Sequence, residues 1–364
     1  MKAAVLYEYN TPLVVEEIEM DPPKRAEVLV KMGAAGICRS DYHFMKGEAH
    51  APLPIVLGHE GSGTVEEVGE GVTMAKPGDR VVLSFVSNCG HCFFCTTGRP
   101  NLCETRAASW TSQFDGTSRL RKGDQSIAQF DQMSCFAEAT VVPEVACIPI
   151  PGSVPLEIAA LIGCCVTTGV GAVLLNAQVE PGSTVAVVGC GGVGLNVIMG
   201  AQLVNAGRII AVDVNESKLE FAMKFGATDS VNPSHQDTVA RVRELTGGRG
   251  VDYAFEVFGA GETITMAYGM TRKGGTVVVI GIAPVGDTAP IDAVSIVRDE
   301  KVLKGCYYGS SRMRVDIPKM VELYQSGRLN LDDLVTRRYS LDQINEAYED
   351  LDKGEVGRGV ITTF

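Results

Sequence analysis

The sequence predicts an α/β chain of two domains, one rich in short strands and one built on a parallel sheet covered by helices. Three observations lead to this prediction. Gly and Pro divide the first half into short strand-like segments. From about Pro181, strongly apolar segments alternate with helical stretches, which is typical of parallel strands connected by helices. The length of 364 residues suits two domains better than one, at about 100 to 200 residues per domain.

The individual elements follow from local patterns. The expected strands of the first half are residues 2–7, 14–19, 28–34, 61–68 and 80–83, and residues 107–133 are expected to form a long loop over the site. The expected strands of the second half are residues 184–188, 208–212, 253–256 and 276–280. In the tail, residues 319–325 and 341–351 have helical patterns and residues 359–363 are extended. We expect this tail to complete the first domain.

The charge and the composition disfavour some classes of partner. With 32 basic and 44 acidic residues the formal net charge is -12, which favours a small-molecule ligand over nucleic acid or an anionic membrane. Residues 1–33 lack a charged start followed by an apolar stretch, and we find no apolar run of the roughly 18 to 20 residues that span a bilayer. Eleven cysteines, an odd number, suit a reducing compartment. We therefore expect a soluble cytoplasmic protein.

Four cysteines stand close together in a Cys-x2-Cys-x2-Cys-x7-Cys pattern. They are Cys89, Cys92, Cys95 and Cys103. This spacing lets one short loop place four sulfurs around a tetrahedral zinc, and four thiolates leave no position for substrate. The pattern predicts a structural zinc. A reduced cysteine-rich loop and a pair of disulfides are the alternatives, and the tight spacing argues against both.

A glycine-rich turn follows the apolar segment at residues 184–188. Gly189, Gly191 and Gly194 stand in G-x-G-x-x-G register, with Gly192 and Val193 inside the motif, at the start of a helical stretch. Without side chains the backbone can turn tightly and approach a pyrophosphate, which then lies at the positive end of the helix. Strand, turn and helix together predict a Rossmann dinucleotide site; a glycine turn that only packs helix on strand is the alternative.

An acidic residue in the expected position selects the type of dinucleotide. Asp213 ends the next strand, 19 residues after Gly194. A carboxylate there accepts hydrogen bonds from a ribose diol and repels a 2′-phosphate, so we expect NAD rather than NADP. Lys218 is a candidate for a further ribose or phosphate contact. An ordinary exposed Asp is the alternative interpretation.

Three further residues of zinc-ligand type lie in loops of small residues. Cys38, His59 and Cys164 are separated by 21 and 105 residues, so spacing alone does not join them. From the residues alone, each can equally be a core side chain. Asp41 is suited to accept a hydrogen bond from the imidazole of His59, as the acid behind a metal-bound His often does, or to cap a turn.

Taken together, these motifs resemble the zinc-dependent medium-chain alcohol dehydrogenases over essentially the whole chain. The resemblance rests on Cys-Arg-Ser-Asp-x-His at residues 38–43, Gly-His-Glu at 58–60, the four cysteines, the glycine motif and Gly-Val-Asp-Tyr-Ala-Phe-Glu at 250–256. It implies a GroES-like β-rich catalytic domain at residues 1–165 and 310–364 with a zinc lobe at about 89–103, and a Rossmann NAD domain at 166–309. It also implies an active site between the domains and a homodimer or homotetramer formed through the NAD domain.

The resemblance assigns metal ligands. Cys38, His59 and Cys164 are expected to bind a catalytic zinc, and Cys165 is a rival for the third thiolate. Glu60 is expected behind the metal. Two zincs per chain are therefore implied, one catalytic and one structural. Two thiolates and one neutral imidazole leave Zn2+ able to bind an alcohol and to lower its pKa, and the resulting alkoxide releases hydride readily.

The resemblance also assigns proton transfer and cofactor contacts. Ser40 is expected against the bound oxygen, and His43 is expected to pass the proton from the nicotinamide ribose to solvent, since an imidazole titrates near neutral pH. A loop hydroxyl and a surface His are the alternatives. Expected cofactor contacts are Arg39, Thr168, Ile282 and Arg358, although Thr168 also suits a helix cap.

The substrate is less well defined than the reaction. Phe85, Trp110 and Phe136 are candidates to line an apolar pocket for an alcohol or aldehyde, and each can also be core. Glutathione-dependent formaldehyde dehydrogenases are close relatives, but Ala49 and Phe85 stand where they carry an acid and Tyr, which leaves another thiol adduct as an alternative. A zinc-free quinone or enoyl reductase and a non-catalytic NAD-binding redox sensor are the other classes to test.

Overall fold

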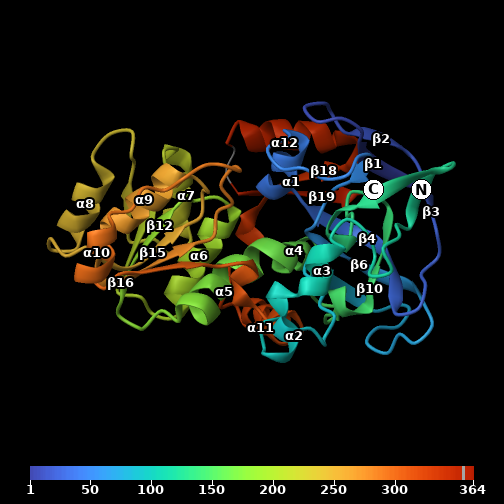
Figure 1. The fold of residues 1–364 in the computed structure, drawn as a ribbon, viewed down its shortest axis with the longest axis horizontal. Coiled ribbons are helices and arrows are strands. Elements are labelled where there is room, and N and C mark those ends of the chain that lie inside the picture. The colour runs from blue at the N-terminus through green and yellow to red at the C-terminus, as the bar shows by residue number, and fades with distance from the viewer. Residues whose placement is uncertain (355–356) are drawn as a thin grey trace. The chain divides into compact units, whose positions relative to one another are not determined.

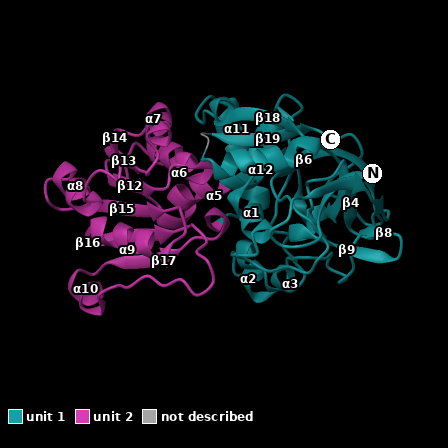
Figure 2. Cartoon of the chain, turned by 90° about the horizontal axis from the view of Figure 1, so that it is seen from above, with its two compact units in different colours: residues 1–165, 311–364 teal, residues 166–310 magenta. Residues whose placement is uncertain are grey.

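The chain forms two compact units in the computed structural model, which describes residues 1–354 and 357–364. Unit 1 comprises Met1–Cys165 and Ser311–Phe364, and unit 2 comprises Val166–Ser310 (Figure 2). Unit 1 thus takes residues from both ends of the chain.

Unit 2 is a doubly wound parallel sheet, as predicted (Figure 1). Its strands are β12 (Thr184–Val188), β13 (Arg208–Val212), β14 (Asp229–Val231), β15 (Val251–Glu256), β16 (Thr271–Val279) and β17 (Val302–Gly305). In the described part of the chain they follow the order β14-β13-β12-β15-β16-β17, which is the 3-2-1-4-5-6 order of a Rossmann fold. The order reverses beside β12, so the end of β12 is the expected ligand position.

Local sequence explains where the helices of unit 2 begin. They are α5 (Thr167–Gly171), α6 (Gly192–Leu203), α7 (Glu216–Lys224), α8 (Thr238–Leu245), α9 (Gly261–Met270) and α10 (Ala293–Arg298). Asn215, Asp237 and Asp292 each cap a helix, because their side chains accept a backbone N–H from the first turn. Helix α6 has no such side chain, because Gly191 occupies its N-cap position. Its first turn therefore stays accessible to a ligand.

Unit 1 consists of mostly antiparallel sheets with short helices; only β5 with β9 and β18 with β19 pair in parallel among the described residues. Its strands are β1 (Lys2–Leu6), β2 (Val14–Glu17), β3 (Glu19–Met20), β4 (Glu27–Gly36), β5 (Ile55–Val56), β6 (Gly61–Val68), β7 (Arg80–Leu83), β8 (Leu120–Lys122), β9 (Gln125–Gln129), β10 (Ala139–Pro143), β11 (Cys147–Pro149), β18 (Val335–Ser340) and β19 (Arg358–Thr363). Its helices are α1 (Arg39–Met45), α2 (Phe93–Thr96), α3 (Glu104–Ala108), α4 (Leu156–Leu161), α11 (Met313–Gln325) and α12 (Ile344–Asp352). In one sheet, β19 from the tail pairs with β4 through Val360 and Gly36.

Three expectations about unit 1 need correction. Residues 107–133 are not one long loop, because β8 and β9 form a hairpin inside them. The strand expected at residues 14–19 is interrupted at Ile18, so β2 and β3 join different neighbours. Helix α11 begins at Met313, before Pro318 rather than after it, because burial of Met313 and Ile317 outweighs the hydrogen bond that Pro318 removes inside the helix.

One helical run among the described residues is long and apolar enough to cross a membrane, contrary to our expectation. It covers Leu156–Ala177, 22 residues with a mean hydropathy of 2.3 in the most apolar stretch, and 89% of that stretch is buried inside the protein. The run joins α4 and α5 through π-helical segments at Ile162–Val166 and Ala172–Ala177. Such burial is that of a core helix, which passes the same test of length and composition as a membrane span.

Candidate active site

The four cysteines of the 89–103 segment come together in unit 1. Their ligand atoms all lie within 4.8 Å of one another, and the Sγ of Cys92 is 3.5 Å from that of Cys95 and 4.0 Å from that of Cys103. Backbone N–H groups of Cys89 and Cys92 donate to the sulfurs of Cys103 and Cys89. Burial opposes ionisation of Cys89, but the hydrogen bonds to its sulfur lower its pKa to about 6. A deprotonated sulfur is the form that a metal requires.

A second cluster joins four buried side chains from separate parts of unit 1. Cys38 precedes α1, His59 and Glu60 lie between β5 and β6, and Cys164 lies in the π-helical segment after α4. One ligand atom of each lies within 4.8 Å of the others. π-Helical turns are rare and are frequent at functional sites.

The distances in both clusters fit a tetrahedral zinc. Bonds of about 2.3 Å to sulfur and about 2.0–2.1 Å to nitrogen separate a sulfur from a nitrogen ligand by about 3.6 Å and two sulfurs by about 3.8 Å. The Sγ of Cys164 is 3.4 Å from Nε2 of His59. Two sulfurs and one imidazole nitrogen are typical ligands for zinc, and three protein ligands are typical of a catalytic site.

Asp41 orients the imidazole of His59. The hydrogen bond predicted between them is present, because Oδ1 of Asp41 lies 3.0 Å from Nδ1 of His59 and also accepts the backbone N–H of Gly58 at 3.0 Å. This bond directs Nε2 of His59 toward Cys164. Carboxylate, imidazole and metal ligands in this order are the usual arrangement behind a metal-bound His.

The members of the second cluster shift one another's ionisation. A hydrogen bond from the thiol of Cys164, together with the charge of His59, holds the pKa of Cys38 well below its ordinary value. The same bond and burial raise the pKa of Cys164. Burial opposes protonation of His59, but the charges of Asp41 and Cys38 raise its pKa. The cluster therefore favours one thiolate already in the metal-free protein.

Glu60 and Arg358 form a buried ion pair behind this cluster. Arg358 donates to Oε2 of Glu60 at 2.5 Å, and both side chains are buried. Burial raises the pKa of Glu60 to about 8, against the opposing effect of Arg358. Oε1 of Glu60 has no hydrogen-bond partner among the described residues. A cation held by Cys38, His59 and Cys164 would give this buried oxygen a partner.

The geometry favours Cys164 over its rival. Cys165 is fully buried, and its sulfur faces the carbonyl oxygen of Leu161 at 3.6 Å. Burial raises the pKa of the Cys165 thiol, which keeps it protonated. Among the described residues, Cys164 belongs to the second cluster and Cys165 does not.

The residues expected to transfer the proton lie on α1. The Oγ of Ser40 is 3.7 Å from the Sγ of Cys38. His43 follows three positions later, and its Nδ1 lies 2.5 Å from Oε2 of Glu48. Its side chain is 22% exposed, so it reaches solvent. Arg39, on the same helix, pairs with Asp352 at 3.3 Å.

The glycine loop of unit 2 connects β12 to α6 and is joined to Asp213. Gly189 has a φ of 96°, and a Cβ on Gly194 would lie 1.9 Å from the carbonyl oxygen of Gly189. Both positions therefore require glycine. The carboxylate of Asp213 accepts the N–H of Cys190 at 2.8 Å and the N–H of Asn215 at 3.0 Å. A carboxylate offers about four acceptor positions, so two ribose hydroxyls can still bind.

Other expected cofactor residues also lie in unit 2. Lys218 is partly exposed on α7, one turn beyond the end of β13. Ile282 is 62% exposed and follows β16. Thr168 lies inside α5 and is buried, so it is not the N-cap of that helix.

Two of the three expected pocket residues belong to one group of aromatic rings around His59. The ring of Phe85 is 5.3 Å from that of His59, and Trp110 packs on Phe44 and Phe130. Phe136 is fully buried and packs on Tyr348.

Phe130, which the prediction did not name, also packs on His59. Its ring lies 5.8 Å from the ring of His59. The sequence analysis missed Phe130 and the neighbouring Asp131, which pairs with Arg106. Positive φ angles at Asp131, Gln132 and Ser134 turn the chain here. Asp is enriched in left-handed conformations, but the residue types of Gln132 and Ser134 give no such signal.

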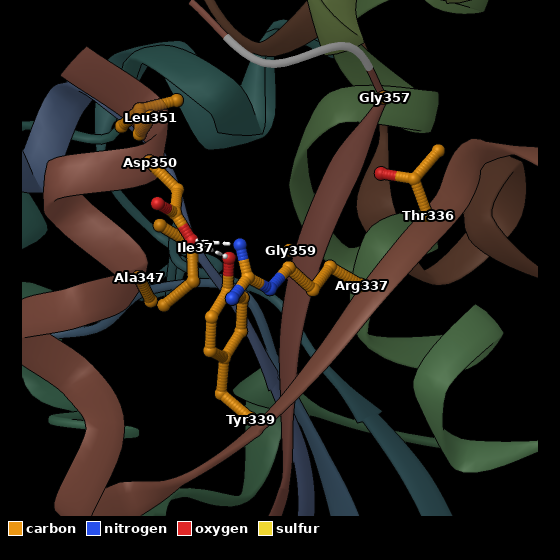
Figure 3. Close-up of a pocket in the computed structure, with 9 residues that line it drawn as sticks. All are labelled: Ile37, Thr336, Arg337, Tyr339, Ala347, Asp350, Leu351, Gly357 and Gly359. Atoms are coloured by element: carbon orange, nitrogen blue, oxygen red, sulfur yellow. Dashed lines mark hydrogen bonds and ion pairs between the residues drawn. The ribbon is translucent and has the colours of Figure 1, made fainter. Parts of the chain in front are cut away.

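Two hollows are lined by described residues that do not belong to either cluster. One, between β18, β19 and α12, has a volume of about 30 Å³, room for little more than water (Figure 3). In it Asp350 pairs with Arg337 and accepts the hydroxyl of Tyr339 (Figure 3). The other, of about 720 Å³, lies at the amino ends of β15 and β16, away from the glycine loop at the carboxyl end of β12. There Arg243 and Lys301 bind carbonyls at the end of α9, which accounts for their charge.

A Rossmann sheet with this glycine loop, together with a unit that holds two clusters of zinc ligands, defines a zinc-binding dehydrogenase. Comparison with known proteins gives the family. The alcohol dehydrogenase GroES-like domain matches residues 24–152, and the zinc-binding dehydrogenase domain matches residues 192–326. The chain belongs to the zinc-dependent medium-chain alcohol dehydrogenase family.

Individual relatives agree over the full length. The NDMA-dependent alcohol dehydrogenase of Amycolatopsis methanolica is 40% identical over 99% of this chain and 98% of its own. The putative alcohol dehydrogenase D of Mycobacterium tuberculosis is 40% identical over the same shares. Among solved structures, the benzyl alcohol dehydrogenase of Acinetobacter calcoaceticus has a TM-score of 0.95 at 34% identity and covers 100% of this chain and 99% of its own. An alcohol dehydrogenase zinc-binding domain protein of Burkholderia ambifaria has a TM-score of 0.95 at 35% identity, over 100% and 98%.

Proposed function

We propose that this alcohol dehydrogenase oxidises a primary or secondary alcohol reversibly to an aldehyde or ketone, with NAD as the hydride acceptor and two zincs per chain. The observation that carries the proposal is the cluster of Cys38, His59 and Cys164, with Asp41 behind the imidazole. Zinc held there supplies a Lewis acid that lowers the pKa of the alcohol, and NAD accepts the hydride.

The side chains of this chain supply the remaining steps. Cys38, His59 and Cys164 hold the metal, and Asp41 fixes the tautomer of His59. Ser40, next to Cys38, accepts the hydroxyl proton at its Oγ. His43 passes the proton toward solvent, since it is partly exposed and its Nδ1 is paired with Glu48. The four remaining ligand cysteines hold the structural zinc.

Asp213 supports NAD as the preferred dinucleotide. Its carboxylate is fixed by two backbone N–H groups at the end of β13, where a ribose diol would bind and a 2′-phosphate would be repelled. The name of the Amycolatopsis relative raises a second possibility, that turnover requires NDMA. Parallel assays with NAD alone and with NDMA added distinguish the two.

An exposed sheet edge supports a homodimer. Strand β17 ends the order of the unit 2 sheet, and Val302 and Leu303 on it are 47% and 45% exposed. Val297 on α10 is 77% exposed. An exposed apolar edge strand readily pairs with another chain.

Eleven free cysteines in the structure support a cytoplasmic location.

Replacement of one ligand sulfur tests the proposal. In Cys38→Ser we expect zinc to fall from two to one per chain and alcohol oxidation to be lost, while the fold remains. Cys165→Ser is the matched control, because its sulfur faces Leu161 rather than the cluster. Unchanged turnover in Cys38→Ser would contradict the metal assignment, and one zinc in the wild-type protein would remove the catalytic site altogether.

A further inference from the structure

A polar bridge connects the four-cysteine cluster with the surroundings of His59. Helix α3 begins directly after Cys103, which is its N-cap residue, and the N–H of Ala107 donates to the carbonyl of Cys103 at 3.1 Å. Arg106 is the third residue of this helix, and its side chain is 12% exposed. The position of Arg106 is therefore set by the last ligand of the cluster.

The guanidinium of Arg106 makes two contacts below the cluster. It donates to the carbonyl oxygen of Phe85 at 3.3 Å and forms an ion pair with the carboxylate of Asp131. The Asp131 side chain is 11% exposed. One planar, forked side chain thus joins two segments that lie 46 residues apart in the sequence.

Both of these segments carry an aromatic ring that packs on His59. The ring of Phe85 lies 5.3 Å from the imidazole at an interplanar angle of 79°, and the ring of Phe130, next to Asp131, lies 5.8 Å away at 63°. Asp131 has a φ of 51°, a left-handed conformation that is uncommon outside glycine but that Asp adopts more often than most residues. Arg106 ties this turn to α3 through the ion pair.

We propose that Arg106 is a positioning residue that fixes the two aromatic contacts of His59 and so makes the geometry of the Cys38–His59–Cys164 cluster depend on the four-cysteine cluster. The inference rests on the proposed metal site. Without Arg106, the carboxylate of Asp131 stays buried without its counter-charge, and the chain near Phe130 keeps its hydrogen bonds to Ser134 but loses the ion pair that ties it to α3. The imidazole then keeps Asp41 but loses its fixed aromatic walls.

Cobalt substitution tests this inference without relying on turnover. We would remove the metal of the second cluster, titrate Co2+ into it, and record the visible spectrum and the affinity. For Arg106→Met we expect an altered spectrum and about 10- to 100-fold weaker affinity, the range seen when groups behind a metal ligand are changed. For Arg106→Lys, which keeps the charge but not the fork, we expect a smaller change in the same direction.

Arg99→Met is the matched control, because Arg99 is exposed in the same segment between Cys95 and Cys103. For Arg99→Met we expect the cobalt spectrum, the Co2+ affinity and the thermal unfolding temperature of the wild-type protein. If Arg106→Met does not fold, Asp131→Asn replaces it, since it removes the same ion pair while keeping the side-chain shape. An unchanged spectrum and affinity in a folded Arg106→Met or Asp131→Asn would overturn this inference but not the proposed function. Failure of the wild-type protein to bind Co2+ at Cys38, His59 and Cys164 would overturn the proposed function as well.

Discussion

Two glycines of the unit 2 loop separate what the cofactor requires from what the fold requires. Gly191 has φ −77° and ψ −169°, an extended conformation open to any residue, and a Cβ there meets nothing within 4 Å. A Cβ on Gly194 would lie 1.9 Å from the carbonyl oxygen of Gly189. A side chain at position 191 would therefore fill open space, which is the space that the pyrophosphate of the proposed NAD would occupy. A side chain at position 194 forces the start of α6 away from the turn.

The expected magnitudes differ accordingly. For Gly191→Val we expect the Kd for NADH to rise by about 100-fold or more, equivalent to about 2.7 kcal/mol of lost binding. The free energy of unfolding should change by less than about 0.5 kcal/mol, as for an uncrowded surface position. For Gly194→Ala the clash should cost about 1–3 kcal/mol of stability. In a unit of this size that lowers the Tm by roughly 2 to 12 °C.

Fluorescence titration with NADH and calorimetric unfolding measure the two effects on the same zinc-loaded preparations. Wild-type Kd in Gly191→Val would refute the placement of the dinucleotide at this loop. Wild-type Tm in Gly194→Ala would show that the loop relaxes more easily than the distance of 1.9 Å implies. Each glycine serves as the control for the other, because each variant should change one measurement much more than the other.

Two further predictions concern stability and assembly. Burial opposes ionisation of Asp316, but hydrogen bonds from Arg312 and Lys319 lower its pKa. The ionised carboxylate therefore contributes its full stabilisation above the unfolded pKa of about 3.9, and this stabilisation is lost as the pH falls through the folded pKa. Asp316→Asn should lower the urea midpoint at pH 7 and approach the wild type in acid, whereas a difference that persists when both are protonated would rule out charge as the cause. Leu303→Lys places a charge on the exposed edge strand β17 and should yield monomers in light scattering, while Lys304→Arg, its neighbour, should assemble as the wild type does. An oligomer in Leu303→Lys would exclude this edge as the interface.

Much of the fold could be predicted because the core strands carry their own signal. Residues 184–188 and 208–212 are apolar runs that end at Gly189 and Asp213, and the structure gives β12 and β13 the same bounds. The hairpin of β8 and β9 could not be predicted, because its residues are mostly polar and its pairing depends on neighbours far along the chain. Helix α11 begins at Met313, six residues before the predicted start at residue 319, because burial of Met313 and Ile317 favours the longer helix despite Pro318.

The candidate site, like the fold, could be predicted only in part from the sequence. Motifs of fixed spacing, such as the four cysteines and the glycine loop, can be read directly, because a short segment contains every member. Arg106 and Asp131 are ordinary polar residues 25 positions apart, and only the fold shows that they pair. Phe136 was chosen from the segment that corresponds to the family's pocket residues, and this correspondence does not reveal that Phe130 rather than Phe136 turns toward His59. The left-handed residues between them decide that orientation.

The discontinuous make-up of unit 1 has a consequence for how the protein is made. Strand β19, which pairs with the end of β4, and Arg358, which neutralises Glu60, both follow unit 2 in the sequence. Unit 2 is therefore complete in the nascent chain before they are synthesised. We expect the Rossmann sheet to fold during translation, whereas the carboxylate behind the metal ligands gains its counter-charge only once Arg358 has been synthesised. Truncations that spare every zinc ligand can still leave that carboxylate buried without a partner.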